Sequence, residues 1–407
     1  MPSRVRKFVC REFTNTVDLD LFRKFLRQFP GDGRIDWDQL PEDDREKREA
    51  LFQIFQRAED LPVELQNALH CAKILAGDAG VSRLVELAEA YDLILVPSQD
   101  GRERADRVDN RSLVLLAFIH HRKLFDRAVD LTRIWSVTRP LERIAARNGV
   151  LTRHEDLLFR EDFRKAVSTY FQRKYCGQYC DVRWYPDGED INILVLHGKN
   201  TRTANVEEEG EERALPFREI AEDTIRYSPA SGWLKVGAPS VRDARKLVEL
   251  FAEHLIGDKN FFSDPLSDEI YTLEPINEAG PDFQFRYGWD HRVTNVVVRE
   301  VLLDDGGLIG KRRRSPWNDR VRDDQNALAR MAWLGIDARN RQLDIAAVKL
   351  DFHLRDGDRD SVVRVNLEPP NTASFQDHSY EDVIFSHLER NGLRRGPRPD
   401  PTALAAE

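Results

Sequence analysis

The sequence is poor in sulfur-containing residues and has no long apolar run. Four cysteines and two methionines occur in 407 residues, and so few cysteines do not make a disulfide framework. One of the longest apolar stretches, 113–119, is far shorter than the roughly 18–20 residues that a membrane-spanning helix needs. The opening residues, MPSRVRKFVCREF, become charged before an apolar core of the signal-peptide type develops. We therefore expect a soluble, cytoplasmic globular protein.

Lysine is also scarce, because 49 of the 62 basic residues are arginine. A GC-rich genome explains this bias simply, and selection for forked guanidinium contacts to phosphate or carboxylate is the functional alternative. The net charge of −9 is uneven: the first 175 residues hold 31 basic and 29 acidic residues, and the remainder holds 31 and 42. The whole molecule should not attract nucleic acid, so any such contact needs a local basic patch.

The two neighbouring cysteines do not have the spacing of a zinc site. Cys176 and Cys180 lie four residues apart in YCGQYC, whereas zinc knuckles and redox pairs separate their cysteines by two residues. No second pair follows at finger spacing, and His197 or His254 would have to be brought in by the fold. We predict ordinary thiols here, and no metal and no cofactor.

Helical periodicity runs through the first 175 residues. Apolar residues recur three and four positions apart in the segments 41–60, 65–75, 81–91, 111–131 and 160–175. This spacing is typical of amphipathic helices with one buried face. We predict an all-helical N-terminal domain, residues 1–175, that serves as a scaffold or as a partner-binding surface.

After residue 180 the period changes to two, which is typical of strands. In residues 176–280 the pattern predicts a hairpin (181–197), a mobile acidic loop (203–213) and a helix from Pro216. A second hairpin (225–236) and a helix capped by Ser240 follow. The pattern of residues 281–393 predicts a repeat of this order, with strands at 283–287 and 293–303, a basic loop, a helix from Ser315-Pro316, a hairpin (344–367) and a helix capped by Ser379.

The predicted fold class is therefore α+β, with a duplicated hairpin-helix (ββαββα-like) antiparallel-sheet domain after the helical one. The two repeat units would share one largely antiparallel sheet that helices cover on one face only. The tail, residues 394–407, should be disordered.

The last predicted hairpin gathers charged side chains on one face. Polar residues alternate with apolar ones on both strands, and because the apolar set must face the core, the polar set shares the opposite face. That set is Lys349, Asp351, His353, Arg364, Asn366 and Glu368. One register puts Lys349 opposite Glu368, Asp351 opposite Asn366, and His353 opposite Arg364.

Lys349, Asp351 and Glu368 outline, in this register, a metal-dependent nuclease or hydrolase site, because two carboxylates can hold a divalent ion. The match is incomplete, since Ala347 stands two positions before Lys349 where an acidic residue is expected. A ligand or partner surface is a second interpretation. Cross-strand ion pairs on a solvated face are the third, and they need no function.

The segment GGLIGKRRRSPW, residues 306–317, carries the densest positive charge of the chain. Its cationic residues are Lys311, Arg312, Arg313 and Arg314, followed by Trp317. It is not a phosphate loop of the nucleotide-hydrolysing type, which requires Ser or Thr after Gly-Lys. Phosphate contacts with base stacking on the tryptophan are one interpretation. Pairing with the acidic segment VEEEGEE of this chain or of a second copy, and a solvated loop without function, are the others.

Taken together, these patterns favour a non-catalytic recognition or adaptor subunit of a bacterial multi-protein system. We expect a protein partner, with nucleic acid as the leading ligand of the basic loop, no membrane, and homo-oligomerisation as an open alternative. No catalytic residue is predicted under this hypothesis. The alternative hypothesis is the metal-dependent nuclease or hydrolase at Lys349, Asp351 and Glu368.

Overall fold

The computed structural model divides into two compact units, Met1–Trp135 and Ser136–Glu407. It describes residues 8–57, 61–96, 108–137, 140–208, 211–304, 320–323, 325–336, 344–356, 359–375 and 380–395. Within these ranges, none of the helices has both the length and the apolar character to span a membrane. The predicted boundary at residue 175 falls inside the second unit, and the finer division at 280 and 393 stays a prediction.

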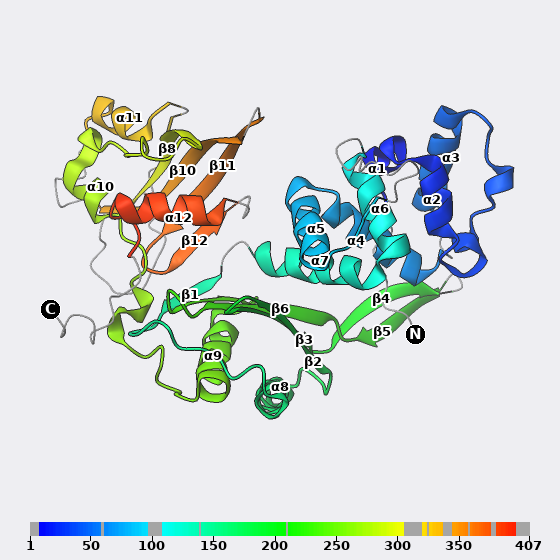
Figure 1. Ribbon diagram of the computed structural model, residues 1–407, viewed down its shortest axis with the longest axis horizontal. Coiled ribbons are helices and arrows are strands. Elements are labelled where there is room, and N and C mark those ends of the chain that lie inside the picture. The colour runs from blue at the N-terminus through cyan, green and yellow to red at the C-terminus, as the bar shows by residue number, and fades with distance from the viewer. Residues whose placement is uncertain are drawn as a thin grey trace. The chain divides into compact units, whose positions relative to one another are not determined.

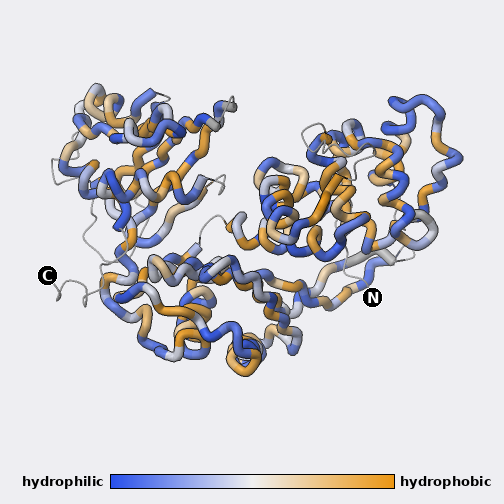
Figure 2. The backbone as a smooth tube through the Cα atoms, in the orientation of Figure 1, coloured by the Kyte–Doolittle hydropathy of each residue, from blue (hydrophilic) through white to orange (hydrophobic). Residues whose placement is uncertain are grey.

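The first unit is helical. Its α-helices are α1 (Arg11–Thr16), α2 (Leu19–Leu26), α3 (Asp44–Arg57), α4 (Val63–Leu75), α5 (Asp78–Ala90), α6 (Asn110–His120) and α7 (Arg122–Trp135). A cluster of edge-to-face and stacked phenylalanine rings lies at its centre, among them Phe22, Phe25 and Phe118. In Figure 2 these helices show hydrophobic turns beside hydrophilic ones, as amphipathic helices do.

The predicted helix 111–131 is wrong in one respect, because it is two helices that meet at His121. That residue ends α6 with a φ of −134°, and α7 begins at Arg122. Buried residues lie on several sides of α6, whereas α7 buries mainly one face. The break lets each helix direct its own apolar surface into the core.

In the part of the second unit that the structure describes, the strands form two separate five-stranded antiparallel sheets and a two-stranded ribbon, and not one sheet as predicted. The first sheet has the order β1-β7-β6-β3-β2, and the second has the order β12-β11-β10-β8-β9. The strands of the first are β1 (Leu141–Ile144), β2 (Cys180–Asp187), β3 (Asp190–Gly198), β6 (Ile220–Ser228) and β7 (Trp233–Gly237). Those of the second are β8 (Val293–Asp304), β9 (Arg320–Arg322), β10 (Asp344–Asp356), β11 (Arg359–Glu368) and β12 (Thr372–Phe375).

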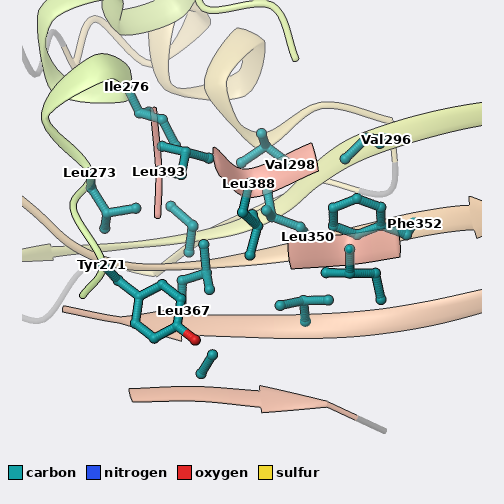
Figure 3. Packing of buried hydrophobic residues seen from close by; sticks show 14 of the residues in the cluster. Tyr271, Leu273, Ile276, Val296, Val298, Leu350, Phe352, Leu367, Leu388 and Leu393 are labelled. Carbon is teal, nitrogen blue, oxygen red and sulfur yellow. The ribbon is translucent and has the colours of Figure 1, made fainter. Parts of the chain in front are cut away.

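Helices cover one face of each sheet (Figure 1). On the first sheet these are α8 (Leu157–Arg173) and α9 (Val241–Phe251), followed by a π-helical turn, Ala252–Ile256. On the second they are α10 (Glu274–Ala279), α11 (Ala327–Trp333) and α12 (Glu381–Arg390). Figure 3 shows Leu350, Phe352 and Leu367 of the second sheet packed toward Leu388 of α12.

Several predicted elements are confirmed. The hairpins β2–β3, β6–β7 and β10–β11 form as expected. The Ser240 side chain accepts a hydrogen bond from the Asp243 N–H and caps α9, and Gly257, with φ 86°, ends the π-helical turn that follows. These elements all have strong local patterns. The α+β class of the chain is thereby confirmed.

Other predicted elements are wrong. The expected acidic loop 203–213 and the helix from Pro216 are instead a two-stranded ribbon, β4 (Arg202–Glu208) and β5 (Glu211–Phe217), and the start of β6. Proline is tolerated there because the ribbon has free edges. No strand forms at 283–287, so the second half does not begin with a hairpin. The predicted ββαββα order therefore does not hold, and the duplication is not confirmed.

Three further predictions concern residues that the structure describes only in part. The basic loop with Lys311–Arg314 and Trp317, the start of the helix at Ser315, and the cap Ser379 lie outside the described residues. Of the predicted disordered tail, Arg394 and Arg395 are described. The Arg395 N–H donates to the Ile270 carbonyl, and Arg394 is the partner of Tyr271 in an isolated β-bridge.

Candidate functional site

The candidate site from the sequence is the face of the second sheet that points away from its helices. We call it the polar face and define it by Arg299, Glu300, Arg320, Arg322, Lys349, Asp351, Arg364, Asn366 and Glu368. The opposite face holds the apolar core, including Val301, Leu350 and Leu367, each at 0% exposure. Lys349, Asp351 and Glu368 do share one face, since each alternates with a buried residue.

The register of the hairpin differs from the predicted one by two residues. Lys349 pairs with Asn366, and Asp351 pairs with Arg364, while β10 and β11 stay paired up to Asp356 and Arg359. Only two residues connect the strands, which is the connection length that antiparallel hairpins favour. A shift of two keeps every side chain on its predicted face but changes every cross-strand partner.

The new register separates the two carboxylates that were expected to share a metal. Asp351 pairs with Arg364, and Glu368 lies four residues further along β11. At the rise of a strand, this places Glu368 about 13 Å from the position opposite Asp351. Asn366 donates a hydrogen bond to Glu368 over 2.7 Å. Among the residues that the structure describes, no group of three or more His, Cys, Asp or Glu side chains is placed to hold a metal ion.

Asp351 lies between two arginines on neighbouring strands. Arg299 Nη1 and Arg364 Nε donate to its two oxygens over 2.8 and 2.9 Å. Burial on its own would raise the pKa of Asp351, but these two hydrogen bonds outweigh it and hold the pKa below its ordinary value. The carboxylate is therefore ionised and engaged by cations, an arrangement suited to ion pairing and not to general-base chemistry.

A β-bulge, which the apolar alternation did not predict, brings Arg299 onto this face. Lys349 pairs with Glu300 and Leu350 pairs with Val298, so that Arg299 is the extra residue in β8. Arg299 and Glu300 consequently both reach the polar face, where Glu300 accepts from Lys349 Nζ over 2.9 Å. The spacing of three between the apolar residues Val298 and Val301 is the signal that could have revealed the bulge.

The first sheet holds a polar cluster beneath its helices that the sequence did not indicate. His197 Nε2 lies 3.1 Å from Asp223 Oδ2, and its ring stacks on Phe171. Asp243 accepts hydrogen bonds from Tyr170 and Lys174, each over 2.5 Å. The five polar members come from α8, α9, β3 and β6, and distances along the chain of up to 73 residues hide the cluster from local patterns.

The two aspartates of this cluster have opposite pKa shifts. Burial raises the pKa of Asp223, which has 0% exposure, and the effects of His197 and Lys174 offset it only in part. Among the residues that the structure describes, its second oxygen has no hydrogen-bond partner. Burial also acts on Asp243, but the hydrogen bonds from Lys174 and Tyr170 outweigh it and lower the pKa. The cluster links both helices to the sheet.

The two sheets meet at a buried charged contact that we call the sheet junction. Glu381 of α12 accepts from Lys235 Nζ of β7 over 2.5 Å and from Arg226 Nη1 of β6 over 2.8 Å. Beside it, Glu142 of β1 accepts from Trp233 over 2.9 Å and from Tyr271 over 2.8 Å. Glu381 is 2% exposed and Glu142 is 0% exposed.

Burial affects the charged groups of the junction, as the pKa of Glu142 shows. Burial raises the pKa of Glu142 despite the opposing effect of Lys235 and Arg394. Arg394 also lies over the Phe385 ring at 4.1 Å and forms an ion pair with Glu389. The junction thus joins the sheets through charges that are shielded from water, and such contacts are sensitive to loss of one partner.

Comparison with protein-family models and with curated proteins found no relative of this chain.

Proposed function

We propose that this chain is a non-catalytic recognition subunit, an adaptor in a bacterial multi-protein system, that contacts phosphate groups through the basic side of its second sheet. The observation that carries the proposal is the charge of the polar face. Its members include five basic residues, Arg299, Arg320, Arg322, Lys349 and Arg364, against three acidic ones. Arginine forks and a lysine on a rigid sheet can position phosphate groups without reading base identity.

The order of the strands along the chain supports including the basic loop in this proposal. β8 ends at Asp304 and β9 begins at Arg320, so the segment that contains Lys311–Arg314 leaves and rejoins the sheet at the β8–β9 pair. Arg320 and Arg322 stand on β9 opposite Leu302 and Glu300. Basic residues of the loop and of the sheet are therefore close along the chain at this edge, and we propose that they act on one ligand.

Electrophoretic retardation of duplex and single-stranded DNA and RNA tests this proposal. We expect a variant with Lys311–Arg314 changed to alanine to bind more weakly to every sequence and to show a shallower dependence on salt. Arg320→Ala with Arg322→Ala should have a smaller effect of the same kind. Arg355→Ala is the matched control, because Arg355 pairs with Asp360 at the far end of the hairpin. Unchanged binding by the loop variant would refute the loop as a ligand site.

The alternative function, a metal-dependent nuclease or hydrolase at Lys349, Asp351 and Glu368, stays a hypothesis that this geometry does not favour. Asp351 is engaged by two arginines and Lys349 by Glu300. Incubation of nucleic acid with the protein and Mg²⁺ or Mn²⁺ tests it directly. We expect no cleavage above that of a control with Asp351→Ala and Glu368→Ala, and cleavage that depends on these two residues would favour the enzyme.

We also propose that the two sheets derive from one duplicated unit smaller than the predicted one. In the first sheet the chain order is β3, an insertion, β6, β7 and α9. In the second sheet it is β8, an insertion, β10, β11, the additional edge strand β12 and then α12. The first three strands named are neighbours in each sheet. The sheet edges differ, so the support is limited to this central part. A protein partner, a cytoplasmic location and self-association remain proposals from the sequence.

A further inference from the structure

A tyrosine closes α8 at a position where helices ordinarily use glycine. Tyr175 has a φ of +61°, its N–H donates to the Gln172 carbonyl, and the N–H of Cys176 donates to the Phe171 carbonyl. These two hydrogen bonds define a Schellman motif, in which the left-handed residue is usually glycine or asparagine. A bulky side chain is disfavoured in this conformation.

Two other helices of the same unit show the ordinary solution. α11 ends with Gly335 at φ 72° and α12 ends with Gly392 at φ 70°, and both repeat the same pair of hydrogen bonds. The side chain of Tyr175 does not compensate for its strained backbone by packing, because it is 82% exposed. Folding therefore does not explain this tyrosine, and strained exposed residues of this kind direct attention to function.

A second exposed tyrosine and several cations lie on the segments that meet at the end of α8. Tyr179, 50% exposed, ends the same turn, and its carbonyl accepts from the Gly198 N–H. Arg218 Nη1 donates to the carbonyls of Tyr175 and Lys199 over 2.5 and 3.1 Å, which ties the turn to the end of β3. We call residues 175–179 the tyrosine turn.

The charge around the tyrosine turn is positive. Arg173 lies in the last turn of α8, and Lys199 and Arg202 lie beside the one carboxylate of this group, Glu219, at 3.0 and 3.8 Å. Arg218 is the fourth cation of this group. Lys174 and Asp243, which form an ion pair with each other, also lie near Cys176 of the turn, so cationic side chains predominate without being the only charges there. Exposed aromatic rings among cations are the combination that binds single-stranded nucleic acid, since bases stack on rings and phosphates contact the cations.

We propose that the tyrosine turn, with Arg173, Lys199, Arg202 and Arg218, is a binding site for single-stranded nucleic acid. Bases stack on Tyr175 and Tyr179, and the strand's phosphates contact the basic side chains. A duplex fits less well, because its bases are already stacked on one another and are closed to the two rings. This site belongs to the first sheet and is independent of the basic loop and polar face of the second.

Fluorescence anisotropy with labelled 20-nucleotide oligo(dT) and oligo(U) tests the site. Tyr175→Gly should weaken binding by about fivefold to a hundredfold, the loss of one stacked base, while raising the melting temperature by about 2–4 °C. Tyr175→Phe keeps the ring and should retain affinity. Trp333→Ala is the control for removing an exposed aromatic residue, since Trp333 is 72% exposed on α11.

The same measurements separate this inference from the proposed function. In a chain with Lys311–Arg314 changed to alanine, Tyr175→Gly should still weaken single-strand binding by the same factor. Unchanged single-strand affinity in Tyr175→Gly, or an equal loss for a 20-base-pair duplex, overturns the inference. So does a result in which Tyr175→Gly loses only an acidic protein partner and keeps its affinity for the oligonucleotides.

Discussion

The two sheets of the second unit are both antiparallel and both covered by helices on one face, yet they treat their polar residues differently. In the first, Asp223 lies on the face that the helices cover, at 0% exposure, and has to find its partners inside the protein. In the second, the polar face is half-exposed and its charges pair under partial solvation. The comparison teaches that the burial of the face on which a charge lies decides what that charge contributes.

The largest expected effect lies where the sheets meet. Glu381→Gln should destabilise the second unit by about 3–5 kcal/mol, because Lys235 and Arg226 would keep buried charges without their carboxylate. Urea denaturation followed by tryptophan fluorescence measures the change. Glu249→Gln, in an exposed pair with Lys246, should change stability little. Equal midpoints for the two variants would contradict a junction stabilised by buried charge.

An intermediate effect is expected on the polar face. Asp351→Asn should cost about 1–2 kcal/mol at pH 7, less than a fully buried pair, because solvent reaches Arg299 and Arg364. Since the folded-state pKa of Asp351 is lowered, its stabilisation is present above the unfolded pKa of about 4 and is lost as the pH falls further. Denaturation curves at pH 7 and pH 3 should show that the difference in stability between Asp351→Asn and the unchanged protein is smaller at pH 3.

The same substitution in the first sheet should act in the opposite direction. The folded-state pKa of Asp223 is raised, so this residue lowers stability progressively as the pH rises from about 4 through that pKa. Asp223→Asn removes the charge and can donate to His197 Nε2, and we expect a gain of up to about 1 kcal/mol at pH 8 that vanishes at pH 4. A large loss at pH 8 would mean that an ionised Asp223 is required.

The smallest effect is expected at the open end of the last hairpin. Arg355 and Asp360 form an ion pair whose side chains are 58% and 72% exposed, and exposed pairs contribute little. Arg355→Ala should leave the melting temperature of the protein unchanged within error. A clear decrease would show that this end of the hairpin is less solvated than the exposure of the two side chains indicates.

Local patterns predicted those parts of the fold that depend on neighbouring residues. The helices α3, α4 and α8 and the cap at Ser240 follow from apolar spacing and capping chemistry. The stretch after Pro216 was predicted to be helical because proline suits a first helical turn, whereas pairing of β6 with β3 makes it a strand. That pairing joins residues about 30 positions apart and has no local pattern.

The candidate site was predictable in its face but not in its contacts. Alternation correctly placed Lys349, Asp351 and Glu368 on one side, because a strand period of two is local. Their partners depended on the length of one turn and on the bulge at Arg299, and one changed register replaced a carboxylate pair by an arginine-carboxylate cluster. The junction and the His197 cluster needed the tertiary fold itself.

The sheet junction also sets an order on the biosynthesis of the protein. Glu142 on β1 emerges early from the ribosome, but Tyr271, Glu381 and Arg394, which complete its surroundings, follow much later. Leu393 and Arg395 complete the closure through backbone hydrogen bonds to Thr272 and Ile270. A nascent chain can therefore form the first sheet while it is still being translated, and it can complete the junction of the two sheets only after Arg395 has been synthesised.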